Sequence, residues 1–164
     1  MEEPTVNLAP VSVETLLLRA DASGRWSYRR VVTARRPGET PDAAARRVAG
    51  VTSEAVSAVV HSTSWRYEPD GGIVLTYAVC PDPEPGLAAT VMSELRLARG
   101  GAPATPAPDV LEVENVVTHA IRHLAFLKKT DPVVCAVLRQ TPEIAKALDL
   151  ASPSTAAEMT ARAS

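Results

Sequence analysis

Three dipeptides in this chain each join a helix-capping residue to a proline: Thr40-Pro41, Asp131-Pro132 and Thr141-Pro142. A capping side chain accepts a hydrogen bond from the free backbone N–H groups of the first turn. Proline fits the first helical position because that position needs no N–H. Each dipeptide therefore predicts a helix start. We expect helices over about 40–49, 132–140 and 142–150, with the first ending at Gly50.

A longer helix is predicted from Asp109. This residue can cap, and Glu112 follows three residues later, which approximates a capping box. Apolar residues then recur at helical spacing as far as Leu124. Lys128 and Lys129 fall where the negative end of the helix dipole favours them. We expect this helix and the two after it to form a C-terminal helical layer.

Four segments carry the apolar patterns of strands, namely 11–18, 26–34, 59–67 and 73–80. Turn-forming residues separate the members of each pair, so two antiparallel hairpins are expected. The order of strands and helices predicts a mixed α/β sheet with helical layers, in one domain over 1–150.

Two segments have no clear pattern. Residues 87–108, rich in proline and glycine toward their end, are left without an assigned structure. Residues 151–164 have little to bury, and we expect a frayed tail.

Composition excludes some classes of protein. The net charge is −2 and no basic stripe is visible, which argues against nucleic acid as a partner. No apolar run approaches the roughly 20 residues of a membrane helix, and the acidic N-terminus does not resemble a signal peptide. Cys80 and Cys135 lie on segments with buried patterns, so we expect reduced core residues. A cytoplasmic protein is the expectation.

Residues 37–47, Pro-Gly-Glu-Thr-Pro-Asp-Ala-Ala-Ala-Arg-Arg, resemble the start of the Nudix box. That motif runs Gly, five residues, Glu, seven residues, Arg-Glu, an apolar residue, one residue, Glu-Glu, one residue, Gly. Glu39 matches the first glutamate, and Arg47 matches the arginine. The usual surroundings are matched by Gly38, Thr40, Pro41, Ala44 and Ala45. The resemblance implies a Nudix-like α/β/α sandwich, here with additional C-terminal helices from about residue 109.

The second half of the box departs from the family pattern. Val48 stands where the glutamate beside the arginine is expected, and Val51 and Thr52 stand at the paired glutamates. Thr33 replaces the opening glycine, and Glu54 replaces the closing one. The family's hydrolysis of diphosphates needs divalent ions held by those glutamate oxygens. The resemblance therefore implies a domain that has lost this activity.

The surviving residues suggest two roles. Glu39 and Arg47 can form a structural ion pair that ties the loop to the helix. They can also contribute to a ligand site with Trp65 and Arg66, where the indole stacks on a planar group and an arginine meets an anion. The plainer interpretation of Trp65 and Arg66 is an aromatic core residue beside a solvated arginine.

A metal site is the remaining chemical candidate. His119 and His123 are four residues apart on the long helix, and Glu112 shares their face. Two imidazoles and a carboxylate suit a transition metal such as zinc. The alternative is a partly exposed polar flank of the helix, or a contact between subunits.

The leading hypothesis is a Nudix-like domain without the catalytic glutamates, which binds a small anionic ligand or nucleotide, or a protein, with no cofactor. The first alternative is a divergent Mg²⁺-dependent hydrolase of diphosphate linkages in nucleoside diphosphate-type substrates. Its relocated ligands would be drawn from five acidic residues: Glu39, Glu54, Asp82, Glu84 and Asp109. The second alternative is a purely structural homodimer built through the C-terminal helices.

Overall fold

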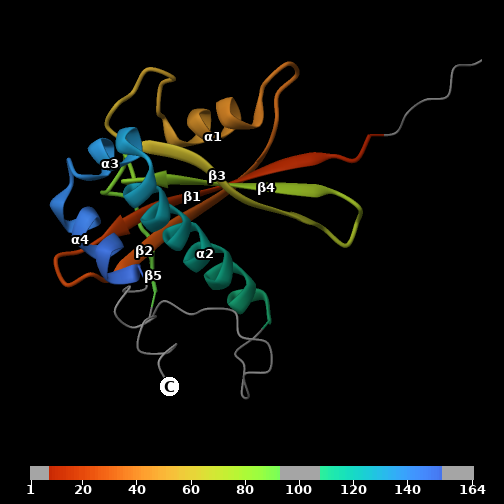
Figure 1. Ribbon diagram of the computed structural model, residues 1–164. Helices are drawn as coiled ribbons and strands as arrows, with labels where there is room; N and C mark the ends of the chain where they lie inside the picture. Colours follow the sequence, from red (N-terminus) through yellow and green to blue (C-terminus); the bar gives the residue numbers. More distant parts are fainter. Residues whose placement is uncertain (1–7, 93–107, 153–164) are drawn as a thin grey trace, which may run out of the picture.

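The computed structural model describes residues 8–92 and 108–152, except for the side chains of 108–112. Its strands are β1 (Val11–Ala20), β2 (Trp26–Ala34), β3 (Val59–Tyr67), β4 (Ile73–Cys80) and β5 (Thr90–Val91). They form one mixed five-stranded sheet in the order β3-β4-β1-β2-β5 (Figure 1). The mixed α/β fold class predicted from the sequence is confirmed.

The two predicted hairpins form the sheet by pairing with each other. β1 pairs antiparallel with β2, and β3 pairs antiparallel with β4. The hairpins join through β1 and β4, which run parallel with Leu17 opposite Val79. β5 extends the far edge by pairing with β2, and it lies in the segment that the sequence left unassigned.

Helices cover both faces of the sheet (Figure 1). α1 (Pro41–Ala49) lies on one face, and α2 (Pro108–Thr130), α3 (Pro132–Leu138) and α4 (Pro142–Ala151) lie on the other. Strand alternation explains the two cores. Leu16 and Leu18 of β1 pack with α2, whereas Val13 and Leu17 pack on the α1 side.

Most of the predicted helix ends are observed. Thr40 Oγ1 accepts a hydrogen bond from Ala43 N at 3.1 Å, and Gly50 ends α1 in the left-handed conformation with φ 70°. Asp131 accepts from the first backbone N–H groups of α3. α4 begins at Pro142 with Thr141 at the N-cap position, as predicted, but the Thr141 side chain makes no capping hydrogen bond.

Some expectations fall outside the described chain, and two are corrected. α2 begins at Pro108, and the side chains of Asp109 and Glu112 lie outside the described residues, as do residues 153–164 of the predicted tail. Ala151 is the buried last residue of α4, so the predicted start of the tail at 151 is wrong. Cys80 is a fully buried free thiol as expected, but Cys135 is partly exposed, so its predicted place in the core is wrong. No helix in the described ranges combines the length and apolar composition needed to cross a membrane.

Candidate functional site

Glu14 is a buried carboxylate on the face of β1 that packs toward α2. Only 1% of its side chain is exposed. Arg66 holds both of its oxygens, at 2.9 and 3.0 Å, and Arg30 Nε and Thr76 Oγ1 donate at 2.7 and 2.8 Å. Burial raises the pKa of Glu14, but the hydrogen bonds from Arg66, Arg30 and Thr76 outweigh it and hold the pKa below its usual value. Glu14 is therefore an ionised group within the sheet.

The four members of this Glu14 cluster come from four strands. Arg66 is on β3, Thr76 on β4, Glu14 on β1 and Arg30 on β2. These strands are consecutive in the sheet, and Glu14 lies directly beside Thr76 in the parallel register. Alternation turns all four side chains toward the α2 side. The cluster therefore ties both hairpins together on one face.

A hollow of about 750 Å³ lies over the Glu14 cluster, between the sheet and the N-terminal half of α2. Its walls are Glu14, Arg30, Arg66, Tyr67, Glu68, Pro69, Val113, Asn115 and Val116. Its volume is typical of small-molecule sites, and charged groups at one side face apolar groups of the helix.

Arg30 is the member of the cluster with donors to spare. It gives only Nε to Glu14, and no other side-chain bond of Arg30 is formed within the described residues. Its side chain is 38% exposed and borders the hollow. A guanidinium fixed through Nε can present its two terminal nitrogens to a carboxylate or phosphate group.

The structure does not bring the four predicted ligand residues together. Arg66 belongs to the Glu14 cluster. Trp65 precedes Arg66 on β3, so its side chain lies on the opposite face of the sheet. Trp65 is 60% exposed and meets Tyr67 edge to face, with ring centroids 5.2 Å apart. Trp65 is thus a surface residue, and Arg66 is an ion-paired one.

Glu39 and Arg47 form the ion pair expected from the box resemblance. Arg47 holds both carboxylate oxygens, at 2.8 and 2.9 Å, and also donates to Ala34 O at 3.3 Å. The Arg47 bonds, together with the backbone N–H of Arg36, lower the pKa of Glu39 to about 2. Both side chains are therefore engaged in holding the loop against α1, which leaves Glu39 poorly placed to bind a metal.

The end of α1 comes before the positions that the box resemblance aligns with the paired glutamates. The helix stops at Ala49, and Gly50 turns the chain away. Val51 then packs in the core with Leu17 and Val79, and Thr52 is exposed. The positions of the paired glutamates thus carry no carboxylate, and they also lie outside the helix.

The other acidic candidates are scattered or engaged. Asp82 as a whole residue is 5% exposed. Arg29 donates two hydrogen bonds of 2.8 Å to the Asp82 carboxylate, and Arg19 donates a third. Glu84 lies 3.8 Å from Arg29, and Glu54 is exposed. Among the side chains that the structure describes, those of 8–92 and 113–152, no three or more from His, Cys, Asp or Glu are placed to hold a metal ion.

The two histidines of α2 lie close to a third histidine, His61 of β3, which nothing in the sequence connects with them. The rings of His119 and His123 lie 6.4 Å apart, and the ring of His61 on β3 lies 5.1 Å from His123. His119 Nε2 donates to Thr63 O at 3.2 Å. The third predicted member, Glu112, has its side chain outside the described residues.

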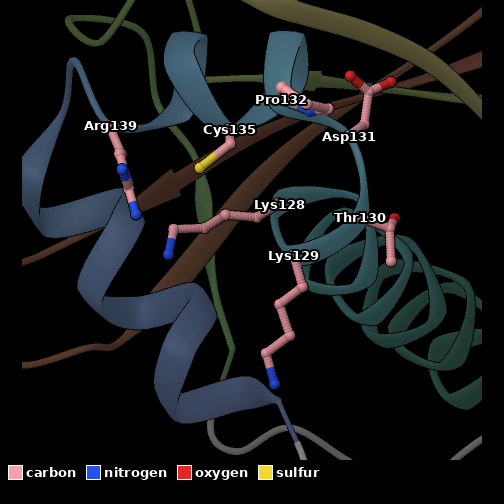
Figure 2. A pocket seen from close by; sticks show the side chains of 7 residues that line it. All are labelled: Lys128, Lys129, Thr130, Asp131, Pro132, Cys135 and Arg139. Atoms are coloured by element: carbon pink, nitrogen blue, oxygen red, sulfur yellow. The ribbon is translucent and has the colours of Figure 1, made fainter.

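A second, smaller hollow of about 310 Å³ lies where α2 meets α3. Figure 2 shows Lys128 and Arg139 reaching toward one another, with the Cys135 sulfur beside them. Lys128 is already paired with Asp149 at 2.7 Å, and Asp131 caps α3. Lys128 thus links α2 to α4, and Asp131 caps α3, so neither side chain is available to a ligand in the way that Arg30 is. This hollow is therefore the weaker candidate site.

Comparison with known protein families, with curated proteins and with solved structures gave no match. The fold and the Glu14 cluster define a mixed α/β domain with a ligand-sized hollow on its α2 face.

Proposed function

We propose that this chain is a Nudix-like domain without pyrophosphohydrolase activity, and that it binds a small anionic ligand in the hollow over the Glu14 cluster. The observation that carries the proposal is the buried Glu14 carboxylate, which fixes Arg30 through Nε at the border of the hollow, while the terminal nitrogens of Arg30 make no hydrogen bond within the described residues.

The arrangement suits recognition of a carboxylate or phosphate group. Arg30 is oriented before the ligand arrives, so little side-chain freedom is lost on binding. Its two terminal nitrogens can donate in parallel to two anionic oxygens. Val113, Val116 and Pro69 offer apolar contact to the rest of the ligand, and the Asn115 amide offers a polar one.

The α1 side of the molecule supports binding without hydrolysis. Attack on a diphosphate needs metal ions to neutralise charge and to generate hydroxide. α1 ends before the positions of the paired glutamates, and Glu39 is held by Arg47. The hollow lies on the opposite face of the sheet from α1.

The test is a thermal-shift and calorimetry screen of nucleotides, dinucleotides, sugar nucleotides and prenyl diphosphates, each with and without Mg²⁺. A ligand at 100 times its dissociation constant stabilises the native state by about 2.7 kcal/mol, which is a clear rise in melting temperature. We expect binding that is independent of Mg²⁺ and that weakens at least about tenfold in Arg30→Met, the loss of one charge-assisted contact.

Arg25→Met is the matched control, because Arg25 is exposed and its side chain makes no hydrogen bond within the described residues. This variant should bind as the wild type does. Mg²⁺-dependent hydrolysis of a nucleoside diphosphate derivative, abolished by Glu39→Gln, would contradict the proposal.

A further inference from the structure

The three histidines of this chain all meet at the contact between β3 and α2. His61 comes from β3, and His119 and His123 lie one turn apart on α2. The His61 and His123 rings are tilted by 48°, with centroids 5.1 Å apart. His119 stacks on His123 at 6.4 Å. We call these three residues the histidine cluster.

Backbone carbonyls accept hydrogen bonds from two of the rings, and the third ring makes no hydrogen bond within the described residues. His61 Nδ1 donates to Ser62 O at 2.8 Å, and His119 Nε2 donates to Thr63 O at 3.2 Å. Thr63 sits at a β-bulge and has no partner on β4 in the register, which frees its carbonyl for α2. His123 Nε2 is buried and makes no hydrogen bond within the described residues. A proton added there would gain no acceptor.

No acidic group balances the histidine cluster in the described chain. β4 and α3 contain no Asp, Glu, Lys, Arg or His, and the charged residues of α4 are Glu143, Lys146 and Asp149. None of these three charged side chains shifts the pKa of His123. On α2, Lys128 pairs with Asp149, and on β3, Arg66 pairs with Glu14. Arg122, next to His123 in the sequence, has a buried Nε that makes no hydrogen bond within the described residues.

We propose that the histidine cluster is a pH-sensitive latch, which holds α2 against β3 while its rings are neutral and loosens this contact when a second ring is protonated. Two imidazolium groups about 5 Å apart repel one another when no carboxylate lies between them. The buried Nε2 of His123 also makes no hydrogen bond within the described residues, so a proton added there is not stabilised by an acceptor.

The latch shares its two elements with the hollow over the Glu14 cluster. Arg66 and Tyr67 of β3 and Val113 and Val116 of α2 form walls of that hollow. Loosening of α2 from β3 widens the gap between these walls, so acidification releases the ligand. This last step rests on the proposed function, whereas the latch itself does not.

The direction of the pH effect follows from His123. Burial lowers its pKa, and the neighbouring His61 and His119 lower it further. The unfolded chain, with an ordinary histidine pKa of about 6.5, then binds more protons than the folded one. The contribution to stability is present above about pH 6.5 and is lost as the pH falls from there through the lowered pKa of His123.

A histidine NMR titration tests the latch directly, because the chain has only three imidazole signals to follow. We expect the His123 signal to titrate below the ordinary histidine pKa of about 6.5, because the ring is buried beside two other imidazoles. His123→Phe keeps an aromatic ring in place and removes the imidazole whose protonation loosens the contact. A His123 signal that titrates at or above the ordinary histidine pKa would overturn the proposal.

Hydrogen exchange, corrected for the intrinsic effect of pH, locates the opening. Between about pH 7.5 and about pH 5, on either side of the ordinary histidine pKa, exchange should quicken at least tenfold in 61–67 and 113–123 relative to β2. His119→Gln, at an exposed position, should reduce this change even if His123→Phe folds poorly. A uniform change over the whole sheet contradicts the latch.

The ligand step has its own readout. In the wild type, affinity should fall at least tenfold over the same pH range, and it should stay nearly constant in His123→Phe. If hydrogen exchange shows the opening but affinity does not change, then the link to the hollow is wrong and the latch stands. If no ligand of the screen binds at any pH, the proposed function fails, and the titration and exchange experiments still decide the latch.

Discussion

Two buried carboxylates, Asp82 and Glu14, have the same chemistry in different surroundings. Each accepts hydrogen bonds from two arginines, and each has a side chain that is at most 1% exposed. Asp82 holds Arg19 and Arg29, which are 19% and 13% exposed, and Arg29 stands opposite Leu17 on the α1 side. The arginines of Glu14 are 38% and 34% exposed and face a hollow on the α2 side.

The difference separates a purely structural ion cluster from one that can also bind. Arg29 gives Asp82 both Nε and Nη2, and Arg19 bonds both to Asp82 and to Glu84 O. Glu84 N also donates to Asp82, so this cluster fastens the 82–84 segment to the ends of β1 and β2. The Glu14 cluster is closed toward the sheet and open toward the hollow. A buried ion pair therefore indicates a ligand-binding site only where one partner keeps unused hydrogen-bond donors beside a cavity.

The largest expected effect is the loss of stability in Asp82→Asn. The substitution removes the buried counter-charge of Arg19 and Arg29 and leaves only the exposed Glu84 carboxylate, 3.8 Å from Arg29, which costs about 3–5 kcal/mol. Urea denaturation measures the change, and at temperatures where the variant is folded its ligand affinity should equal that of the wild type. A loss below about 1 kcal/mol, as for an ordinary surface substitution, would show that Asp82 is not the fastening described here.

Glu14→Gln should cost less, about 2–3 kcal/mol, because Arg30 and Arg66 are about one-third exposed and can be rehydrated. The same denaturation measurement applies. Unlike Asp82→Asn, this variant should change the affinity for the anionic ligand, since Arg30 loses the group that orients it. Equal affinities in Glu14→Gln and wild type would remove the distinction between the two clusters.

Acid sensitivity should be shared by both clusters. Burial works against ionisation of Glu14 and Asp82, but the hydrogen bonds of their arginines prevail and lower both pKa values. A lowered pKa in the folded state gives stability that is present above the ordinary carboxyl pKa and is lost as the pH falls through the lowered one. Denaturation between about pH 5 and about pH 2 should show this loss, and each variant should flatten the curve. Identical curves for wild type and variants would contradict it.

The smallest effect is expected from Glu39→Gln. The pKa of Glu39 is lowered to about 2 by Arg47, yet the ion pair is partly exposed, with 26% of Arg47 and 13% of Glu39 accessible, so water and salt can weaken it. We expect a slight decrease in melting temperature that shrinks in high salt, with unchanged ligand affinity. A large loss of binding would instead give the α1 loop a direct part in ligand recognition.

Much of the fold could be predicted because its signals are local. The patterns over 26–34, 59–67 and 73–80 give the observed limits of three strands, and the proline starts give the beginnings of α1, α3 and α4. Capping and alternation act between near neighbours in the chain. Two local predictions failed. Thr141 precedes a helix but its side chain makes no capping hydrogen bond, and Cys135 lies on a face of α3 that is only partly buried.

The candidate site could be predicted only in part, because its residues meet across long stretches of chain. Glu14 lies 52 residues from Arg66 and 62 from Thr76, and the parallel pairing of β1 with β4 brings them together. One signal was present, since Glu14 interrupts the apolar run from Val13 to Leu18. A charged residue in such a run is buried with a partner, although the partner is not visible in the sequence.

The most direct test of the central claim is a map of backbone amide shifts on adding the tightest ligand from the screen, with and without Mg²⁺. We expect the shifts to gather around Arg30, 66–69 and 113–116, which border the hollow, and we expect Mg²⁺ to change nothing. Shifts that gather around Glu39 and Arg47 and require Mg²⁺ would contradict it, and would place a metal-dependent site on the α1 side.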